Sequence, residues 1–298
     1  MKVSYYPGCT LKTKAKNLEE AAVASMAVLG VELEELPRWN CCGAVHSLAD
    51  DDLIHHVAPV RDLVRVMEQG SKKVVTLCSM CYNTLARANL LMRHDDVKRK
   101  TINDFMNEEK DYHGEVEVLH FLNFLRDEIG WDRLREKVKV PLKDIKAATY
   151  YGCTLLRPKD VAIEPPGDRK IFAEFLQALG ATPIDFSAGT LCCGSYQILA
   201  NPDAALHVAA TIIDGAAGAG ANALVLSCPL CEYNLGKTQE RLAQSGKITN
   251  QVPVFYFTQL LAIALGLGDE VCRFDLNEKA AVDFLTSRKY VSSAAHAA

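Results

Sequence analysis

The chain has 298 residues, of which 49% are hydrophobic and 23% charged, so it has room for two domains with substantial cores and lacks the composition of a disordered chain. Its formal net charge of −4 argues against a nucleic-acid partner. The longest apolar run, from Leu260 to Leu267, is too short to span a bilayer, and the strand-like start at residues 2–6 is unlike a signal peptide, so we expect no membrane segment and a cytoplasmic location.

Strands and helices alternate in the first half of the chain. Their expected order is a strand at 2–6, a helix at 17–29 ended by Gly30, a strand at 31–36, a helix at 51–69 ended by Gly70, a buried strand at 73–77, and a strand running into an apolar helix between Val116 and Gly130. Alternation of this kind predicts a parallel sheet with helices packed on it.

The second half repeats this plan. Its expected helices lie near 168–179 and 203–217, a strand lies at 223–227, and the segment from Val252 to Gly266 resembles that from Val116 to Gly130. The predicted fold class is therefore α/β, with two duplicated domains related by pseudo-two-fold symmetry. We place the domains at 1–145 and 146–298, because the charged stretch 131–146 joins the two copies.

One segment has no counterpart in the second half. Residues 92–117 are highly charged, and we interpret them as a solvated helix and loop, with a docking surface as the less favoured interpretation.

Ten of the 11 cysteines form two matching groups of five. The first pentad is Cys9, Cys41, Cys42, Cys78 and Cys81, and the second pentad is Cys153, Cys192, Cys193, Cys228 and Cys231. Each has the order of a single cysteine, a Cys-Cys-Gly motif and a Cys-x-x-Cys motif. The first gaps are 31 and 38 residues long, and the second gaps are 35 and 34.

The expected strands place each pentad at one edge of a sheet. Cys9, Cys78, Cys153 and Cys228 each follow a strand, and carboxyl ends of parallel strands carry binding sites. Each Cys-x-x-Cys opens a helix, whose N-terminus favours the thiolate that ligates metal. We expect Gly43 and Gly194 to let the backbone pass close to a bulky inorganic core.

Several simpler explanations compete. A lone Cys-x-x-Cys is typical of a redox pair or half a zinc site, and adjacent cysteines are often only buried. Zinc and a conventional [4Fe–4S] cube each need four ligands, whereas each group here has five. Cys272 stands alone, so we expect a structural role for it. Among the histidines only His46, three residues after Gly43, is kept as a candidate site residue.

At these residues the chain resembles the cysteine-rich CCG family, and within it the B subunit of heterodisulfide reductase. The resemblance rests on the doubled pentads, on Tyr5–Cys9, and on the segment from Val140 to Cys153, and it covers nearly the whole chain. It implies two non-cubane [4Fe–4S] clusters, one held by each pentad, with no catalytic residue beyond them.

The resemblance also implies an activity and partners. A disulfide lies between the two clusters and is split in two one-electron steps. The electrons come through a C subunit with ferredoxin-type [4Fe–4S] clusters from a flavin-containing A subunit, in a soluble electron-bifurcating complex. The disulfide is that of coenzyme M and coenzyme B or another one. Lys12, Lys14, Arg38, Arg157 and Lys159 lie near cysteine segments and are candidates to bind its anionic groups.

Two alternatives stay open. The same family includes iron–sulfur electron-transfer subunits of lactate- and glycolate-type oxidoreductases, which carry out no disulfide chemistry. A zinc-binding scaffold ranks last, because zinc needs only four ligands and would leave the fifth cysteine of each pentad without a role.

Overall fold

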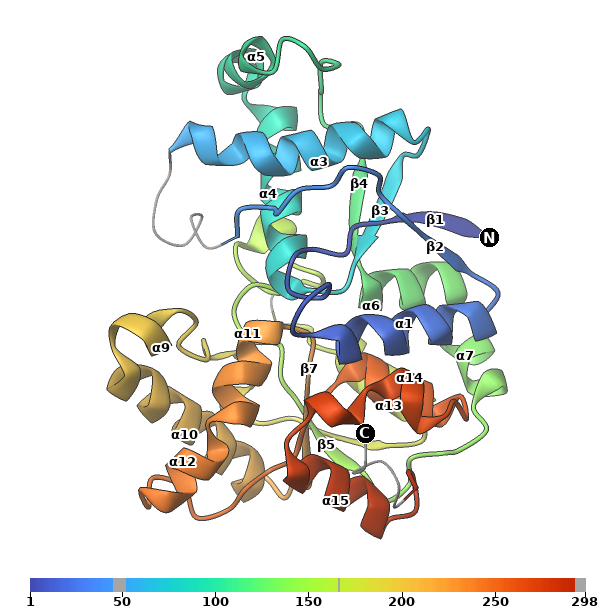
Figure 1. The fold of residues 1–298 in the computed structure, drawn as a ribbon, viewed down its shortest axis with the longest axis vertical. Coiled ribbons are helices and arrows are strands. Elements are labelled where there is room, and N and C mark those ends of the chain that lie inside the picture. The colour runs from blue at the N-terminus through green and yellow to red at the C-terminus, as the bar shows by residue number, and fades with distance from the viewer. Residues whose placement is uncertain (45–51, 166, 293–298) are drawn as a thin grey trace.

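The computed structural model describes residues 1–44, 52–165 and 167–292, and it contains two parallel sheets flanked by helices (Figure 1). The first sheet has the strand order β2-β1-β3-β4 and the second the order β6-β5-β7-β8. Every pairing is parallel, so the predicted α/β class and its duplication are confirmed.

The first half runs from β1 to the π-helical turn η2. Its strands are β1 (Lys2–Tyr5), β2 (Glu32–Glu35), β3 (Lys73–Thr76) and β4 (Glu117–His120). Its helices are α1 (Lys16–Val28), η1 (Leu53–His56), α3 (Val57–Glu68), α4 (Ser79–His94), α5 (Asp96–Phe105), α6 (Phe121–Phe124) and η2 (Leu125–Ile129). Helix α7 (Trp131–Lys137) leads into the second half.

The second half repeats the order of the first. Its strands are β5 (Lys146–Thr149), β6 (Thr182–Ile184), β7 (Ala223–Leu226) and β8 (Val254–Tyr256). Its helices are α8 (Ile171–Ala178), α9 (Gln197–Ala200), α10 (Pro202–Gly218), α11 (Pro229–Glu232), η5 (Tyr233–Lys237), α12 (Gln239–Gln244), α13 (Phe257–Ala264), α14 (Asp269–Cys272) and α15 (Lys279–Ser287), with 3-10 turns η3 (Lys159–Val161), η4 (Ser187–Thr190) and η6 (Phe274–Leu276).

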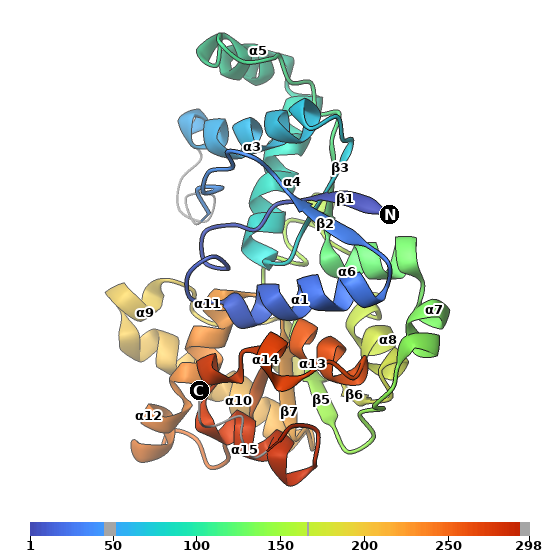
Figure 2. The same cartoon turned by 45° about the vertical axis from the view of Figure 1, so that its right-hand side comes forward.

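Helices of each half pack against helices of the other half. Helix α1 packs on α13 and α14 of the second half, while α8 packs on α6 and α7. Figure 2 shows α1 lying along this boundary beside α13 and α14. Since α1 corresponds to α8 and α6 to α13, matching elements meet in matching pairs, as a pseudo-two-fold relation requires.

Aromatic side chains fill the centre of this boundary. The ring centroid of Phe257 lies 5.7 Å from those of Phe121 and Phe175 and 6.2 Å from that of Phe172, all with inclined planes. Such edge-to-face contacts add to the burial of the rings themselves. The two halves therefore share one hydrophobic core.

Buried polar groups fix the halves against each other. Thr258 Oγ1 on α13 donates to the carbonyl of Leu18 on α1 at 2.9 Å. Asn123 Nδ2 on α6 donates to the carbonyl of Ile163 at 2.8 Å. Both bonds cross the boundary where water is excluded, which makes them geometrically specific.

The charged segment 92–117 forms the end of α4, helix α5 and a loop that extends from the first half at the top of Figure 1. Side chains Val97 and Phe105 on α5 are 77% and 61% exposed. The expected helix and loop are thus present, and part of the segment is solvated, but Ile102, Met106, Tyr112 and Val116 are buried.

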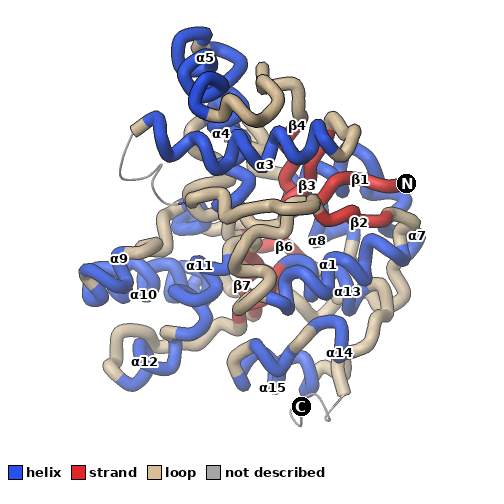
Figure 3. The backbone as a smooth tube through the Cα atoms, turned by 45° about the horizontal axis from the view of Figure 1, so that its top comes forward, coloured by secondary structure: helices blue, strands red, loops and turns tan. Residues whose placement is uncertain are grey.

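Figure 3 shows the strands in two groups, each with helices around it. In the described part of the chain, no helix is both long enough and apolar enough to cross a membrane.

Candidate functional site

The strands place the single cysteines and the Cys-x-x-Cys motifs as predicted. Cys9 lies beyond the end of β1 and Cys153 beyond the end of β5. Cys78 and Cys228 follow β3 and β7 and are the residues that precede α4 and α11. Pro229 occupies the first turn of α11, where its missing N–H costs no hydrogen bond.

Tyrosine hydroxyls hold both Cys-Cys-Gly loops. Tyr6 donates to the carbonyl of Asn40 at 2.7 Å, and Tyr150 donates to the carbonyl of Leu191 at 2.7 Å. In each case the acceptor is the residue directly before the two cysteines. The repeated Tyr-Tyr pairs at 5–6 and 150–151 are the sequence signal for this support, although their hydroxyls were not predicted as part of the site.

The first pentad forms a continuous chain of thiols. Cys41 Sγ lies 3.7 Å from Cys9 Sγ, and Cys42 Sγ lies 3.7 Å from Cys81 Sγ. The thiols of Cys41 and Cys42, and those of Cys81 and Cys78, are close enough to shift each other's pKa. The exposure of the thiols falls along this chain, from exposed Cys9 and Cys41 to buried Cys78.

The second pentad repeats the same order. Its thiols shift one another's pKa in the order Cys153, Cys192, Cys193, Cys231 and Cys228, which matches the order of the first pentad.

The two chains of thiols meet at their buried ends. Cys78 and Cys228 lie close enough for each to shift the pKa of the other, and both residues are 5% exposed. The sulfur-lined sites therefore adjoin across the boundary between the halves.

Shared protons divide the thiols into donors and acceptors. Hydrogen bonds from Cys41 and then Cys81 hold the pKa of Cys42 well below its usual range. Hydrogen bonds from Cys153 and Cys193 lower the pKa of Cys192 to about 2, and the charge of Arg157 acts in the same direction. The thiolate, which is the form that binds metal, is therefore favoured at Cys42, Cys192 and Cys228. The pKa is raised at Cys41, Cys78, Cys81, Cys153, Cys193 and Cys231.

The sulfur spacing fits a metal cluster. Two thiolates bound tetrahedrally to one metal at about 2.3 Å lie about 3.8 Å apart, close to the two distances of 3.7 Å in the first pentad. Among the described residues, no three Cys, His, Asp or Glu side chains converge as the ligands of a single ion. These two distances are those of thiolates that share a metal atom.

Glycine makes room for this arrangement at Gly8. Its φ is +75°, and a Cβ atom there would lie 2.8 Å from Cys81 Sγ. Gly43 and Gly194 also have positive φ values, but a Cβ at Gly194 would meet the backbone of Ala205 on α10 at 2.9 Å. The missing Cβ thus makes room for a cysteine sulfur at Gly8, which was not predicted, and for helix α10 at Gly194.

The candidate cations differ in availability. Lys12 pairs with Glu19 and Glu35, and Arg38 pairs with Glu68, so these charges are committed to the protein. Arg157 is exposed, and its positive charge helps to lower the pKa of Cys192. Lys14 and Lys159 are exposed.

Three residues outside the pentads, His46, Cys272 and His120, were also considered. His46 lies outside the described residues. Cys272 is buried, with its sulfur 4.0 Å from the carbonyl of Gln259, as expected of a structural residue. His120 is fully buried, with Nε2 3.1 Å from the carbonyl of Leu77.

Two buried asparagines were missed as site residues. Asn83 Nδ2 donates to the carbonyls of Thr154 and Arg157 at 2.8 and 2.7 Å, and so holds the loop after Cys153. Asn234 Nδ2 donates to the carbonyls of Cys193 and Ser195, both at 3.0 Å. The two asparagines occupy similar places in the repeat, but they follow Cys81 and Cys231 by two and three residues, so they point in different directions.

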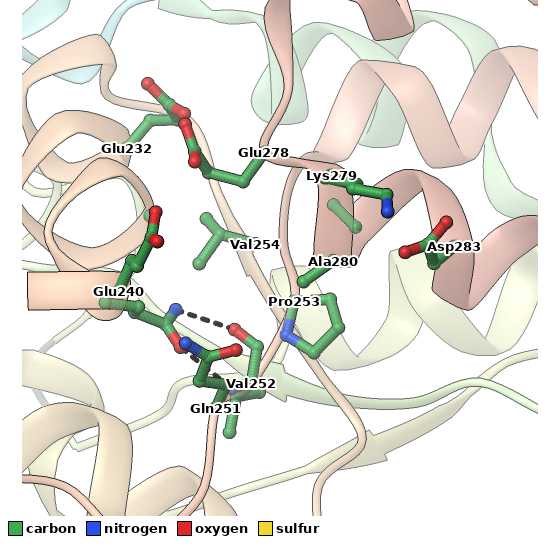
Figure 4. A pocket seen from close by; sticks show the side chains of 13 residues that line it. Glu232, Glu240, Gln251, Val252, Pro253, Val254, Glu278, Lys279, Ala280 and Asp283 are labelled. Carbon is green, nitrogen blue, oxygen red and sulfur yellow. Dashed lines mark hydrogen bonds between the residues drawn. The ribbon is translucent and has the colours of Figure 1, made fainter. Parts of the chain in front are cut away.

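A separate cavity of about 360 Å³ lies between η5, α12 and α15 (Figure 4). Its lining includes Glu232, Glu240, Glu278 and Asp283 and no cysteine. Burial raises the pKa of Glu232 to about 7. This cavity is distinct from the sulfur-lined sites.

Comparison with known proteins agrees with the repeated sulfur sites. The family model described as "Cysteine-rich domain", CCG, matches residues 3–86 and 147–236, which together make up more than half of the chain. The chain belongs to the CCG cysteine-rich domain family.

Named relatives extend along nearly the whole chain. The 8-methylmenaquinol:fumarate reductase membrane anchor subunit of Wolinella succinogenes is 34% identical over 266 residues, which cover 89% of this chain and 92% of that protein. The B subunit of the ferredoxin:CoB-CoM heterodisulfide reductase of Methanosarcina mazei is 27% identical over 296 residues, or 98% of each chain.

A solved structure shares the fold. A hypothetical protein from Helicobacter pylori superimposes with a TM-score of 0.72 at 12% identity over 93% of this chain. The chain spans about half the length of that protein.

Proposed function

We propose that the protein is the disulfide-reducing subunit of a heterodisulfide reductase-like complex. The observation that carries this proposal is the meeting of two five-thiol sites at Cys78 and Cys228. Relatives named as the B subunit of heterodisulfide reductase support it, because they match over nearly the full length of both chains. The same names support an oxidoreductase that works as one part of a larger assembly.

The cofactors in this proposal are two non-cubane [4Fe–4S] clusters, one for each pentad. When bound, such clusters store and release single electrons. The ten cysteines hold them, and Tyr6 and Tyr150 orient the Cys-Cys-Gly loops. Burial of Cys78 and Cys228 keeps water from the junction, while exposed Cys9 and Cys41 leave the site open to a small disulfide.

The two adjoining sites explain why the pentad is doubled. Splitting a disulfide takes two electrons and yields two thiolates, so each site supplies one electron to one sulfur of the substrate. Two sites within reach of the same bond avoid the release of a thiyl radical.

The proposed partners are a C subunit with ferredoxin-type clusters and a flavin-containing, electron-bifurcating A subunit, in a soluble cytoplasmic complex. The names of the relatives, which are those of single subunits, support an assembly of this kind.

A turnover assay tests the proposal. Anaerobically purified, iron-loaded protein should reduce a small disulfide with reduced viologen as the donor, and Cys193→Ala should abolish this turnover while Cys272→Ala retains it. Cys272 is the matched control, because it is equally buried but lies outside both pentads. Failure to turn over any disulfide in a fully loaded preparation would contradict the proposal.

A second candidate function is electron transfer linked to a quinol, without disulfide chemistry. The relative from Wolinella succinogenes favours it, because its identity of 34% exceeds the 27% of the relative from Methanosarcina mazei. Oxidation of a reduced menaquinone analogue by the loaded protein, together with no disulfide turnover, would select this function.

A further inference from the structure

The two sulfur-lined sites are alike in topology but differ in the groups around their sulfurs. The differences lie in three places: the helix after each Cys-x-x-Cys, the loop after each single cysteine, and the helix beneath each Cys-Cys-Gly loop. Each place can be compared because the repeat supplies a matching position in the other half.

The helix after the Cys-x-x-Cys gives the second site an extra hydrogen-bond donor. Asn234 is 1% exposed, and its Nδ2 lies 3.5 Å from Cys193 Sγ as well as 3.0 Å from the carbonyls of Cys193 and Ser195. Its Oδ1 has no partner among the described residues, so a flipped amide would leave the donors unused.

The matching position in the first half provides no such donor. Thr84 follows Cys81 by three residues, as Asn234 follows Cys231, and its hydroxyl donates to the carbonyl of Met80 at 2.9 Å. Tyr6 and Tyr150 each donate their single proton to a carbonyl in the same way. Two hydroxyls do lie near sulfurs of the first site, because Tyr6 also interacts with Cys42 and Thr10 Oγ1 lies 3.7 Å from the exposed Cys9 Sγ.

The charges differ in the same direction. Arg157 lies four residues after Cys153 and its charge acts on Cys192, whereas the residue four after Cys9 is the neutral Thr13. Beneath the first site, Asp62 is 1% exposed and burial raises its pKa to about 8, so this carboxyl carries little charge near pH 7; the corresponding stretch of α10 has Ile212 and Ile213.

We propose that the second site is the more oxidising of the two, with Asn234 as the residue that raises its reduction potential and Arg157 as a weaker contributor. Hydrogen bonds to ligating sulfurs and nearby positive charge favour the reduced, more negative state of an iron–sulfur centre. The second site therefore takes the first electron. This inference rests on the proposed clusters and adds the order in which they accept electrons.

A redox titration of the anaerobic, iron-loaded protein, followed by electron paramagnetic resonance, measures this order directly. We expect two one-electron transitions. Asn234→Thr, which copies the first half, should lower only the upper transition, by about tenfold in equilibrium constant or about 59 mV. Thr84→Val is the matched control and should move neither transition.

Loss of Asn234 could also disturb the loop that it holds, so a second variant at the protein surface tests the same effect. Arg157→Gln should shift the upper transition in the same direction by a smaller amount, and Lys159→Gln, at a neighbouring exposed position, should not. The inference would be overturned if both Asn234→Thr and Arg157→Gln shifted the lower transition. It would also be overturned if neither variant shifted either transition.

Iron analysis of the same samples separates the two proposals. A preparation that binds no iron contradicts the proposed function itself. A fully loaded preparation whose two centres titrate together and ignore both variants contradicts only the inequality of the sites.

Discussion

At the residue scale, Gly8 shows how backbone conformation and sulfur chemistry are linked. Its φ of +75° is accessible to glycine at little cost, and the absent Cβ leaves space for Cys81 Sγ. The sequence showed the glycine before Cys9 but not its contact, because Cys81 lies 73 residues further along the chain.

Gly8→Ala should therefore weaken both folding and metal binding. The left-handed conformation costs about 1–2 kcal/mol for an alanine, and the new methyl group displaces Cys81 from the first pentad. Gly70→Ala is the matched control, since Gly70 has a φ of +78° and no atom lies within 4 Å of the place that its new methyl group would take. Urea unfolding should show a loss in both variants, whereas iron content should fall only in Gly8→Ala; equal iron in the two would show that the sulfur contact is unimportant.

At the element scale, the order of strands and helices was predictable and the packing between the halves was not. Hydrophobic periodicity and glycine stops indicated β1, α1, β3 and α10 to within a few residues, because those signals are local. The exchange of α1 and α8 across the boundary depends on side chains far apart in the sequence, such as Phe121 and Phe257. The described part of the expected helix at 51–69 is a 3-10 turn followed by α3.

His120 joins two of these elements and should make stability depend on pH. Its Nδ1 accepts the N–H of Leu122 at the start of α6, and its Nε2 faces the carbonyl at the end of β3. Burial lowers its pKa from 6.5 to about 4. The folded protein then binds fewer protons than the unfolded chain between these values, so stability is present above pH 6.5 and is lost as the pH falls toward 4, by about 3 kcal/mol at most.

Urea unfolding of the anaerobic protein at pH 7.0 and pH 5.0 measures this loss. His120→Gln should remove most of the pH dependence, and His207→Gln, at an exposed site on α10, should leave it unchanged. An unchanged slope in His120→Gln would assign the acid sensitivity to other groups.

At the scale of the whole molecule, duplication places one chemical site in each half and brings the two together. The ten cysteines and their grouping were visible in the sequence because their spacing repeats. That the two sites face each other was implied only by the family resemblance, and their approach at Cys78 and Cys228 depends on how the halves pack. The same packing bears on the proposed domains 1–145 and 146–298: β5 begins at Lys146, yet the shared aromatic core ties the two sides of that boundary together.

The central claim is that each pentad holds its own four-iron cluster, and iron and acid-labile sulfide analysis of anaerobically prepared protein tests it most directly. We expect about eight iron atoms per chain in the wild type and about four in either Cys42→Ala or Cys193→Ala, with the fold retained. Stoichiometric zinc with little iron in the wild type, or full iron content in both variants, would contradict the account.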